Sequence, residues 1–460
     1  MNIVKGGIVS GILARTPVPR MFHARQTFPR THIDTGAIPT VVATEMAKLG
    51  ISEKIKPGMR IAITVGSRGV ANVAVITRAI VDELLFREAK PFIVPSMGSH
   101  GGATAEGQRE ILAGYGITKE SMGCPIDDSM ETVILGESSR GNPVFCAKSA
   151  YEADGIIIAC RVKPHNAFRG AYESGILKMM VVGLGKREGA ESVHRDGMGK
   201  IAENLIENAR VVLKAAPILF AIPCVENAYD ETLLIEAVPA ERILEREPAL
   251  LQLSFANMPR ILVGEADVLI VDEIGKNYSG TGVDPNVTGT FSTEFASGGL
   301  SVQRTCMLKL SEVSHGNGLG TGLANVITAK LFSSLDGEKM YPNCLTSTVL
   351  KSAMIPMVVA DEREAIQACL RTLNGVEARA ARVVRIANSL HIENIMLSEA
   401  YYDDVVRGSY PGLEALDAPQ ELRFDDSGDL VTPIALEAIE VAQAAEAFKF
   451  FEASNNGSVR

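Results

Sequence analysis

Three side chains that carry positive charge or protons stand directly after short apolar runs in the first half of the chain: Arg68, His100 and His165. Each run is typical of a buried strand, and ligands of an open parallel sheet bind beyond the carboxyl ends of its strands. Imidazole carries protons near neutral pH, and a guanidinium holds a carboxylate or a phosphate through two hydrogen bonds. Together the three positions predict a pocket for a small molecule.

The turn that contains Arg68 has the sequence Gly66-Ser67-Arg68-Gly69 and precedes a helical pattern. A turn that opens a helix offers backbone N–H groups to an anion. We therefore expect Ser67 and Arg68 to bind a phosphate or a carboxylate. The alternative is an ordinary turn with a solvated arginine, and the turn lacks the Gly-Lys-Ser/Thr of a Walker loop.

The surroundings of the two histidines differ. Two glycines follow His100, so a ligand can approach the backbone there closely. Pro164 precedes His165 and restricts its backbone, and Arg169 adds positive charge that would attract a substrate carboxylate. The alternatives are a surface-loop histidine at position 100 and a capping histidine at position 165.

Lys178 lies in an apolar stretch, and His194 follows it sixteen residues later. A lysine in apolar surroundings is costly unless it is paired or used covalently, although a long side chain can also extend its ammonium to solvent. His194 is a candidate metal ligand, whereas a lone histidine is more often structural. In the second half of the chain, Lys276 follows another apolar run, and we expect it to bind substrate.

The elements that must position these residues alternate between short apolar runs and longer helical patterns. This alternation is typical of an α/β protein with mostly parallel sheets. The expected strands are 60–65, 91–95, 155–160, 217–223 and 266–271. The expected helices are 71–87, one that begins near 105, 176–182, 198–214, 239–253, 319–332, 361–373 and 435–451. A domain boundary near residue 260 would divide the chain into 1–260 and 261–460, with the active site in the cleft between two α/β domains.

The composition limits the classes of function. The chain has 460 residues and a formal net charge of −10, which argues against a nucleic-acid-binding surface but allows a small anionic substrate. Seven scattered cysteines predict no disulfide framework. No apolar stretch reaches the roughly 20 residues of a membrane span, and we expect a cytoplasmic protein.

Four of these residues also resemble a known family. The order and spacing of His100, His165, Lys178 and His194 are similar to those of nickel-dependent lactate racemase and its 2-hydroxyacid racemase relatives, over roughly residues 55–290. In that family, a lysine is joined covalently to a pyridinium-derived mononucleotide. This cofactor grips nickel through sulfur, carbon and sulfur, and a histidine supplies the remaining protein ligand. The resemblance implies that separate maturation proteins make the cofactor.

The resemblance implies a role for each matching position. Lys178 resembles the lysine that carries the cofactor, and His194 resembles the nickel ligand. His100 and His165 resemble the pair that acts as acid and base. The Arg68 turn resembles the family's first strand-exit motif, which would suit the mononucleotide phosphate or the substrate carboxylate.

The implied activity is that of an isomerase, a racemase or epimerase of a small 2-hydroxy acid. The C–H bond at the 2-carbon is weakly acidic, so transfer of a hydride to a pyridinium avoids a carbanion, and histidines handle the hydroxyl proton. The chain departs from the family at Gly175-Ile-Leu-Lys178, where the family has Gly-Gly-Arg-Lys, and at Val65, where lactate racemase has an acidic residue. These departures favour a larger or more polar hydroxy acid than lactate.

Two other functions fit the same residues. A metal hydrolase could hold zinc with His100, His165 and His194 and would need no modified lysine. A non-catalytic protein could bind a nucleotide-like ligand. Bound nickel together with added mass on Lys178 separates the racemase from both.

Overall fold

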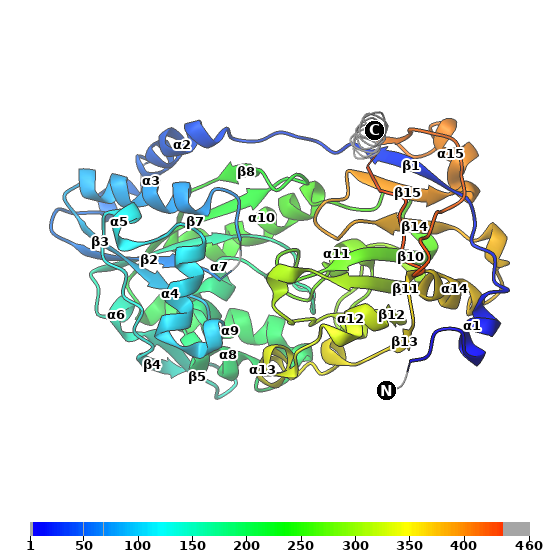
Figure 1. Ribbon diagram of the computed structural model, residues 1–460. Helices are drawn as coiled ribbons and strands as arrows, with labels where there is room; N and C mark the ends of the chain where they lie inside the picture. Colours follow the sequence, from blue (N-terminus) through cyan, green and yellow to red (C-terminus); the bar gives the residue numbers. More distant parts are fainter. Residues whose placement is uncertain (1–2, 49, 68, 436–460) are drawn as a thin grey trace, which may run out of the picture.

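The computed structural model describes residues 3–48, 50–67 and 69–435, and it contains two large β-sheets that lie side by side (Figure 1). Both sheets are mixed but mostly parallel, and helices cover their faces. The expected α/β fold with mostly parallel sheets is thereby confirmed. Arg68 lies outside the described residues, as does all but the first residue of the expected helix 435–451.

The first sheet carries the residues that the sequence singled out. Its strands follow the order β3 (Lys90–Pro95), β2 (Arg60–Val65), β6 (Gly155–Arg161), β7 (Ile218–Glu226) and β8 (Thr232–Ile235), and β9 (Val238–Pro239) also pairs with β7. The first four are parallel to one another, while β8 and β9 run antiparallel to β7. These strands agree closely with the apolar runs, because a strand buried on both faces is apolar at nearly every position.

Helices bury both faces of this sheet. Side chains of β2 alternate between them: Ile61 and Ile63 pack with α2 (Ile38–Met46) and α3 (Val73–Phe86), and Ala62 packs on the opposite side. The opposite face is covered by α8 (Lys186–His194), α9 (Ile201–Ala215) and α10 (Ile243–Asn257). The sheet is therefore packed on both faces, and its strands fix where the loops at their carboxyl ends begin.

The second sheet contains eight strands. Their order is β13 (Met357–Val359), β12 (Val326–Thr328), β11 (Ser301–Leu310), β10 (Glu265–Ile274), β14 (Val383–Ile386), β15 (Asn394–Ser398), β1 (Met21–Gln26) and β16 (Leu413–Ala415). The strands from β13 to β14 are parallel, and the last three pair antiparallel. Because β1 lies in this sheet, residues 21–26 belong structurally with the later half, although a division at residue 260 places them in the first.

The remaining elements are short or cover the edges. They are α1 (Ile8–Leu13), α4 (Ala105–Gly114), α5 (Lys119–Met122), β4 (Thr132–Glu137), β5 (Pro143–Ala147), α6 (Lys148–Tyr151), α7 (Ile176–Lys178), α11 (Pro285–Thr288), α12 (Ala329–Ser333), α13 (Gly337–Ser347), α14 (Glu362–Arg371) and α15 (Tyr402–Val406). Thr104 caps α4, since its side chain accepts a hydrogen bond from the Gly107 N–H. Among the described helices, none is long and apolar enough to cross a membrane.

The expected helix 319–332 is wrong. Residues 321–323 form a 3₁₀ turn, and the chain then enters β12 before the short helix α12. The β-branched run Val326-Ile327-Thr328 pairs with β11 and β13, so sheet formation overrides the helical spacing of the apolar residues. Thr328 then caps α12 through the Leu331 N–H.

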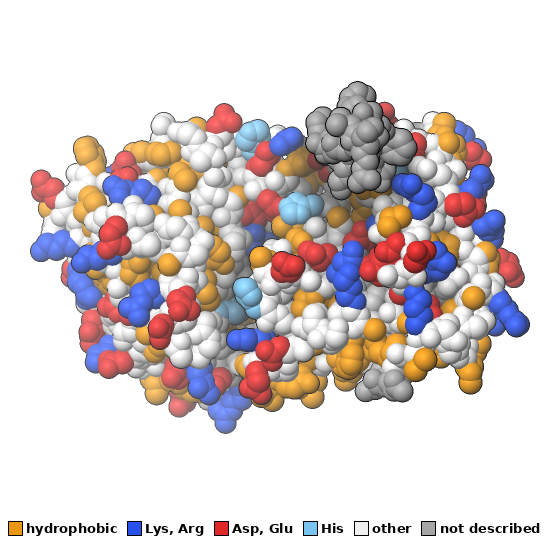
Figure 2. Space-filling view, in the orientation of Figure 1, with side chains coloured by type: hydrophobic (Ala, Val, Ile, Leu, Met, Phe, Trp, Pro, Cys, Tyr) orange, Lys and Arg blue, Asp and Glu red, His pale blue; other side chains and the backbone are white. Residues whose placement is uncertain are grey.

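The two sheets meet at the points where their strand order reverses. In the first sheet, β3 and β6 flank β2, and in the second, β11 and β14 flank β10. Ligands of open α/β sheets bind at such switch points, beyond the carboxyl ends of the strands. The loops after β6 and β10 contact each other through Lys163 and Asp284, whose charged atoms lie 3.2 Å apart. Histidine side chains are exposed along this boundary between the two halves (Figure 2).

Candidate active site

The loop after β6 presents His165 at the boundary. Glu173 is only 1% exposed, and its carboxylate accepts hydrogen bonds from the backbone N–H groups of His165 (2.6 Å) and Gly170 (3.2 Å). The His165 Nδ1 accepts a hydrogen bond from the Ala167 N–H at 3.1 Å. The ring also stacks at a tilt on Phe168, with ring centres 4.3 Å apart. These contacts fix the direction in which the imidazole points.

Arg169 fastens this loop to the second half of the chain. Its guanidinium donates to the Ser297 carbonyl (3.0 Å), to the His165 carbonyl (2.7 Å) and to the Asn286 side chain. It also lies over the ring of Phe291, 5.2 Å from the ring centre. These donors point at protein acceptors that hold the His165 loop in place, and substrate binding by Arg169 stays a prediction.

Lys178 lies at a change of helix type. The helix α7 ends at Lys178, continues as a π-helical turn over Met179–Gly183, and leads through a short turn into α8. Such π-helical turns occur frequently at functional sites. The loops after β2 and β3 pack against this turn so closely that a Cβ at Gly66 or at Gly98 would lie 3.1 Å from its side chains. The strand exits and the Lys178 segment thus form one compact unit.

His194 is the last residue of α8, and its ring is oriented by the helix itself. Its Nδ1 lies 2.6 Å from the Ala190 carbonyl oxygen, one turn earlier. Since a carbonyl can only accept, Nδ1 carries the proton and Nε2 presents a lone pair. Metal-ligating histidines are held in this way. Burial lowers the pKa of His194, and the charge of Lys178 lowers it further, although the bond to Ala190 opposes both.

The charge of Lys178 acts on both His165 and His194, so the three side chains lie near one another. The pKa of His165 falls well below its usual value, first because the ring is desolvated and then because Lys178, His194, Lys163 and Arg169 surround it. A low pKa keeps the imidazole neutral at neutral pH. The structure therefore brings His165, Lys178 and His194 together in one electropositive site.

His100 stands at the neighbouring strand exit. Its Nδ1 lies 2.8 Å from the Met97 carbonyl and 2.8 Å from the Ser67 hydroxyl, so the exits of β2 and β3 are joined through this ring. The Gln108 side chain donates to the carbonyls of Gly98 (3.0 Å) and His100 (3.3 Å) and shapes the loop. Ser67 is thereby placed beside a candidate catalytic histidine.

Lys186 contacts the end of β3, directly before the His100 loop. This residue was not identified from the sequence. Its side chain is fully buried, and its ammonium donates to the Pro95 carbonyl at 2.6 Å. Burial lowers the pKa of Lys186 to about 8. Lys186 stands directly before Arg187 and Glu188, so the sequence gives no sign that this lysine is buried.

Lys276 lies on the loop after β10, across the boundary from the first sheet. Its ammonium donates to the Gly280 carbonyl at 2.7 Å and to the Asn343 side chain at 3.4 Å. The same loop contacts the His165 loop, because the Asn166 amide donates to the hydroxyls of Ser279 and Thr281 at 2.9 and 3.0 Å. Lys276 therefore lies on the face of the second half that adjoins the His165 loop.

Comparison with known proteins supports the resemblance. The lactate racemase N-terminal domain family matches residues 20–204. The resemblance to the lactate racemase family is confirmed for this segment. The matched segment begins and ends earlier than the expected range of 55–290. It contains His100, His165, Lys178 and His194 but not Lys276.

A solved structure and the curated proteins complete the comparison. The lactate racemase apoprotein of Thermoanaerobacterium thermosaccharolyticum is 12% identical to this chain, with a TM-score of 0.48 over 79% of this chain and 93% of its own. No curated protein matches the chain.

A buried acid supports the helix that carries Lys178. Glu247 of α10 is fully buried, and its carboxyl accepts a hydrogen bond at 2.9 Å from the N–H of Leu177, in the first turn of α7. Burial raises the pKa of Glu247 to about 8. Its spacing from Ile243, Leu250 and Leu251 places a charge on the apolar face of α10, which is the sequence signal that was missed.

We predict that Glu247→Gln flattens part of the pH dependence of stability. Because the folded-state pKa lies above the unfolded value, the protonated acid stabilises the fold fully below about pH 4.5, and this contribution is lost as the pH rises through about 8. The difference in unfolding free energy between wild type and variant should fall by about 4 kcal/mol between pH 5 and pH 9. Urea unfolding at several pH values measures it.

The control for this experiment is Glu245→Gln, on the exposed side of the same helix. This variant should keep the pH dependence of the wild type. A Glu247→Gln variant that follows the wild type at every pH would show that Glu247 is charged in the folded protein.

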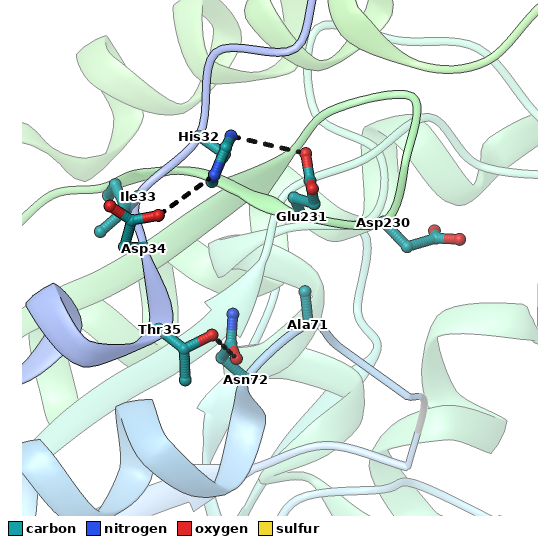
Figure 3. A pocket seen from close by; sticks show the side chains of 8 residues that line it. All are labelled: His32, Ile33, Asp34, Thr35, Ala71, Asn72, Asp230 and Glu231. Carbon is teal, nitrogen blue, oxygen red and sulfur yellow. Dashed lines mark hydrogen bonds and ion pairs between the residues drawn. The ribbon is translucent and has the colours of Figure 1, made fainter.

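A separate hollow of about 300 Å³ lies beside the exits of β2 and β7 (Figure 3). His32 points toward Asp34 and Glu231, at 3.3 and 3.6 Å from their carboxylates, and Asp230 points away from them (Figure 3). Burial and the charge of Glu226 raise the pKa of Asp230 to about 6. With its three acidic side chains, the hollow does not suit a hydroxy-acid anion, which the site around His165 suits better.

Proposed function

We propose that this protein is a racemase or epimerase of a small 2-hydroxy acid, which acts by reversible hydride transfer with a nickel pincer nucleotide joined to Lys178. The observation that carries the proposal is the meeting of His165, Lys178 and His194 in one electropositive site at the switch point of the first sheet. The match of residues 20–204 to the lactate racemase N-terminal domain family supports it.

The residues present fit this cofactor. Lys178 would carry the covalent link, and the lone pair on His194 Nε2 would bind nickel, since Nδ1 is committed to the Ala190 carbonyl. The turn at Ser67 and Arg68 would hold the phosphate. When bound, the cofactor supplies a reversible acceptor for the hydride at the substrate 2-carbon.

The protein's own side chains would handle the substrate. His100 is oriented by the Met97 carbonyl with Nε2 as its basic nitrogen, and it would take the hydroxyl proton. His165 would contact the same oxygen from the neighbouring loop. Lys276 would add positive charge for the substrate carboxylate. Arg169 would hold the His165 loop in place, and thus its distance from the second half of the chain.

The zinc hydrolase receives no support from the described residues. Among them, no group of three or more histidine, cysteine, aspartate or glutamate side chains is arranged to hold a metal ion. The proposed cofactor would need His194 alone as the protein ligand of nickel, and so would need no such group.

The test is intact mass, peptide mapping and metal analysis of protein made together with cofactor maturation proteins from a host that loads a related racemase. We expect added mass on the peptide with Lys178 and about one nickel per chain. Unmodified Lys178 without nickel, in a host shown to load the related enzyme, would overturn the proposal and favour a non-catalytic ligand-binding protein.

A panel of 2-hydroxy acids in D₂O then tests the reaction itself. Hydride transfer returns the same hydrogen to the 2-carbon, so the inverted product should carry no deuterium there. Complete exchange with solvent at the 2-carbon would show proton abstraction instead and contradict the mechanism.

A further inference from the structure

The three histidines of the site differ in what their Nδ1 atoms contact. Nδ1 of His100 faces the Met97 carbonyl at 2.8 Å, and Nδ1 of His194 faces the Ala190 carbonyl at 2.6 Å. A carbonyl can only accept a hydrogen bond, so both rings carry their proton on Nδ1 and a lone pair on Nε2. This is the form of a base or of a metal ligand.

His165 has the opposite arrangement. Its Nδ1 accepts a hydrogen bond from the Ala167 N–H at 3.1 Å, and an atom that accepts from an N–H carries no proton. The neutral ring must then hold its proton on Nε2. If both nitrogens carried a proton, the Nδ1–H would face the Ala167 N–H, and the hydrogen bond between Ala167 and His165 would be lost.

The groups around His165 also favour the neutral ring. Lys163, Lys178 and Arg169 place positive charge near it, and the Glu173 carboxylate binds the backbone N–H of His165 rather than the imidazole. A buried neutral imidazole with one fixed N–H is an effective hydrogen-bond donor to an oxygen that gains negative charge.

We propose that His165 acts as a neutral donor through its Nε2–H to the oxygen on the substrate 2-carbon, and that His100 alone takes and returns the hydroxyl proton. The inference rests on the proposed function for its substrate, while the ring states are properties of the protein alone. The inference gives the two histidines different tasks, whereas the family resemblance implies that they act as an equivalent pair.

The protons and electrons balance with one base. When the hydride leaves the 2-carbon for the acceptor that the proposed cofactor would supply, the hydroxyl proton would move to His100 Nε2 and the O–H bonding electrons would form the carbonyl. The carbonyl oxygen accepts from His165 Nε2–H, which keeps its proton. On the return, His100 gives the proton back while the hydride re-enters either face of the 2-keto acid.

The first test is nitrogen-15 NMR of the histidine rings in the protein without cofactor. The variants His100→Gln, His165→Gln and His194→Gln assign the signals. We expect a protonated Nδ1 for His100 and His194 and a protonated Nε2 for His165. An unprotonated Nε2, or a doubly protonated ring at neutral pH, for His165 would overturn the inference, whether or not turnover is found.

The second test compares two substitutions of the same residue in the loaded enzyme. Glutamine can place an amide N–H near the position of Nε2 but cannot take up a proton, and alanine can do neither. We expect His165→Ala to lower kcat by 10²- to 10³-fold and His165→Gln to lower it by about tenfold. His100→Gln, the matched control, should lose about 10³- to 10⁴-fold.

The outcomes separate this inference from the proposed function. If His165→Gln is as inactive as His165→Ala while the wild type turns over, His165 is a base and the inference fails. If the loaded wild type inverts none of the 2-hydroxy acids, the proposed function fails, and the NMR result still decides the ring state of His165.

Discussion

Replacing Lys178 with arginine is expected to abolish both the covalent cofactor and turnover. The guanidinium keeps the positive charge that His165 and His194 experience, but it lacks the primary amine that the link requires. Because we propose that the cofactor supplies the difficult step, turnover should fall by at least about four orders of magnitude. The expected mass is that of the bare chain, measured on protein made with the maturation proteins.

The matched control for this experiment is Lys200→Arg. Lys200 is exposed and pairs with Glu203 at 2.8 Å, away from the site, so this variant should keep the added mass and full turnover. Thermal unfolding of both variants should resemble that of the wild type. A Lys178→Arg protein that still carries the added mass, or that still inverts a hydroxy acid, would contradict the assignment of Lys178.

Sequence patterns located the strand exits because these strands are buried on both faces. Apolar runs such as 60–65 and 155–160 coincide with β2 and β6 to within a residue, and each is followed by the candidate side chain. Lys178 and His194 were paired by their interval of sixteen residues, and one nearly continuous helical segment indeed carries both. Local pattern is sufficient where a single element fixes the relation between two residues.

Relations between distant segments could not be predicted in this way. The strand β1 at 21–26 pairs with β15 at 394–398, and nothing in either segment specifies a partner so far along the chain. For the same reason the contacts of Arg169 with Asn286 and Ser297 could not be predicted, because these acceptors come from the second half. A charged side chain near a site can be assigned to ligand or to protein only when its neighbours are known.

The position of the proton on each histidine ring could not be predicted from the sequence either. The sequence places His100 and His165 at equivalent strand exits, which suggests equal roles. Their difference arises from single backbone atoms, the Met97 carbonyl and the Ala167 N–H, which are set by the conformation of each loop. Roles in proton transfer therefore depend on loop geometry that residue types do not specify.

Replacing His194 with alanine is expected to remove nickel but leave the organic part of the cofactor on Lys178. The Nε2 lone pair of His194 is the one protein ligand that we assign to the metal, whereas the covalent link depends on the lysine amine. We expect nickel to fall from about one per chain to below about a tenth, and turnover to be lost with it. Metal analysis and peptide mass measured on the same sample separate the two effects.

The control for metal binding at other histidines is His315→Asn. This residue lies in the second half with a φ of 47°, a backbone conformation that asparagine tolerates, so the substitution removes an imidazole with little strain. Its nickel content should equal that of the wild type. If His194→Ala keeps its nickel while His315→Asn loses it, the metal lies in the second half, and the site built on Lys178 would have to be abandoned. If His194→Ala loses the added mass as well, the metal and the organic cofactor are retained only together, and His194 then anchors the whole group rather than the nickel alone.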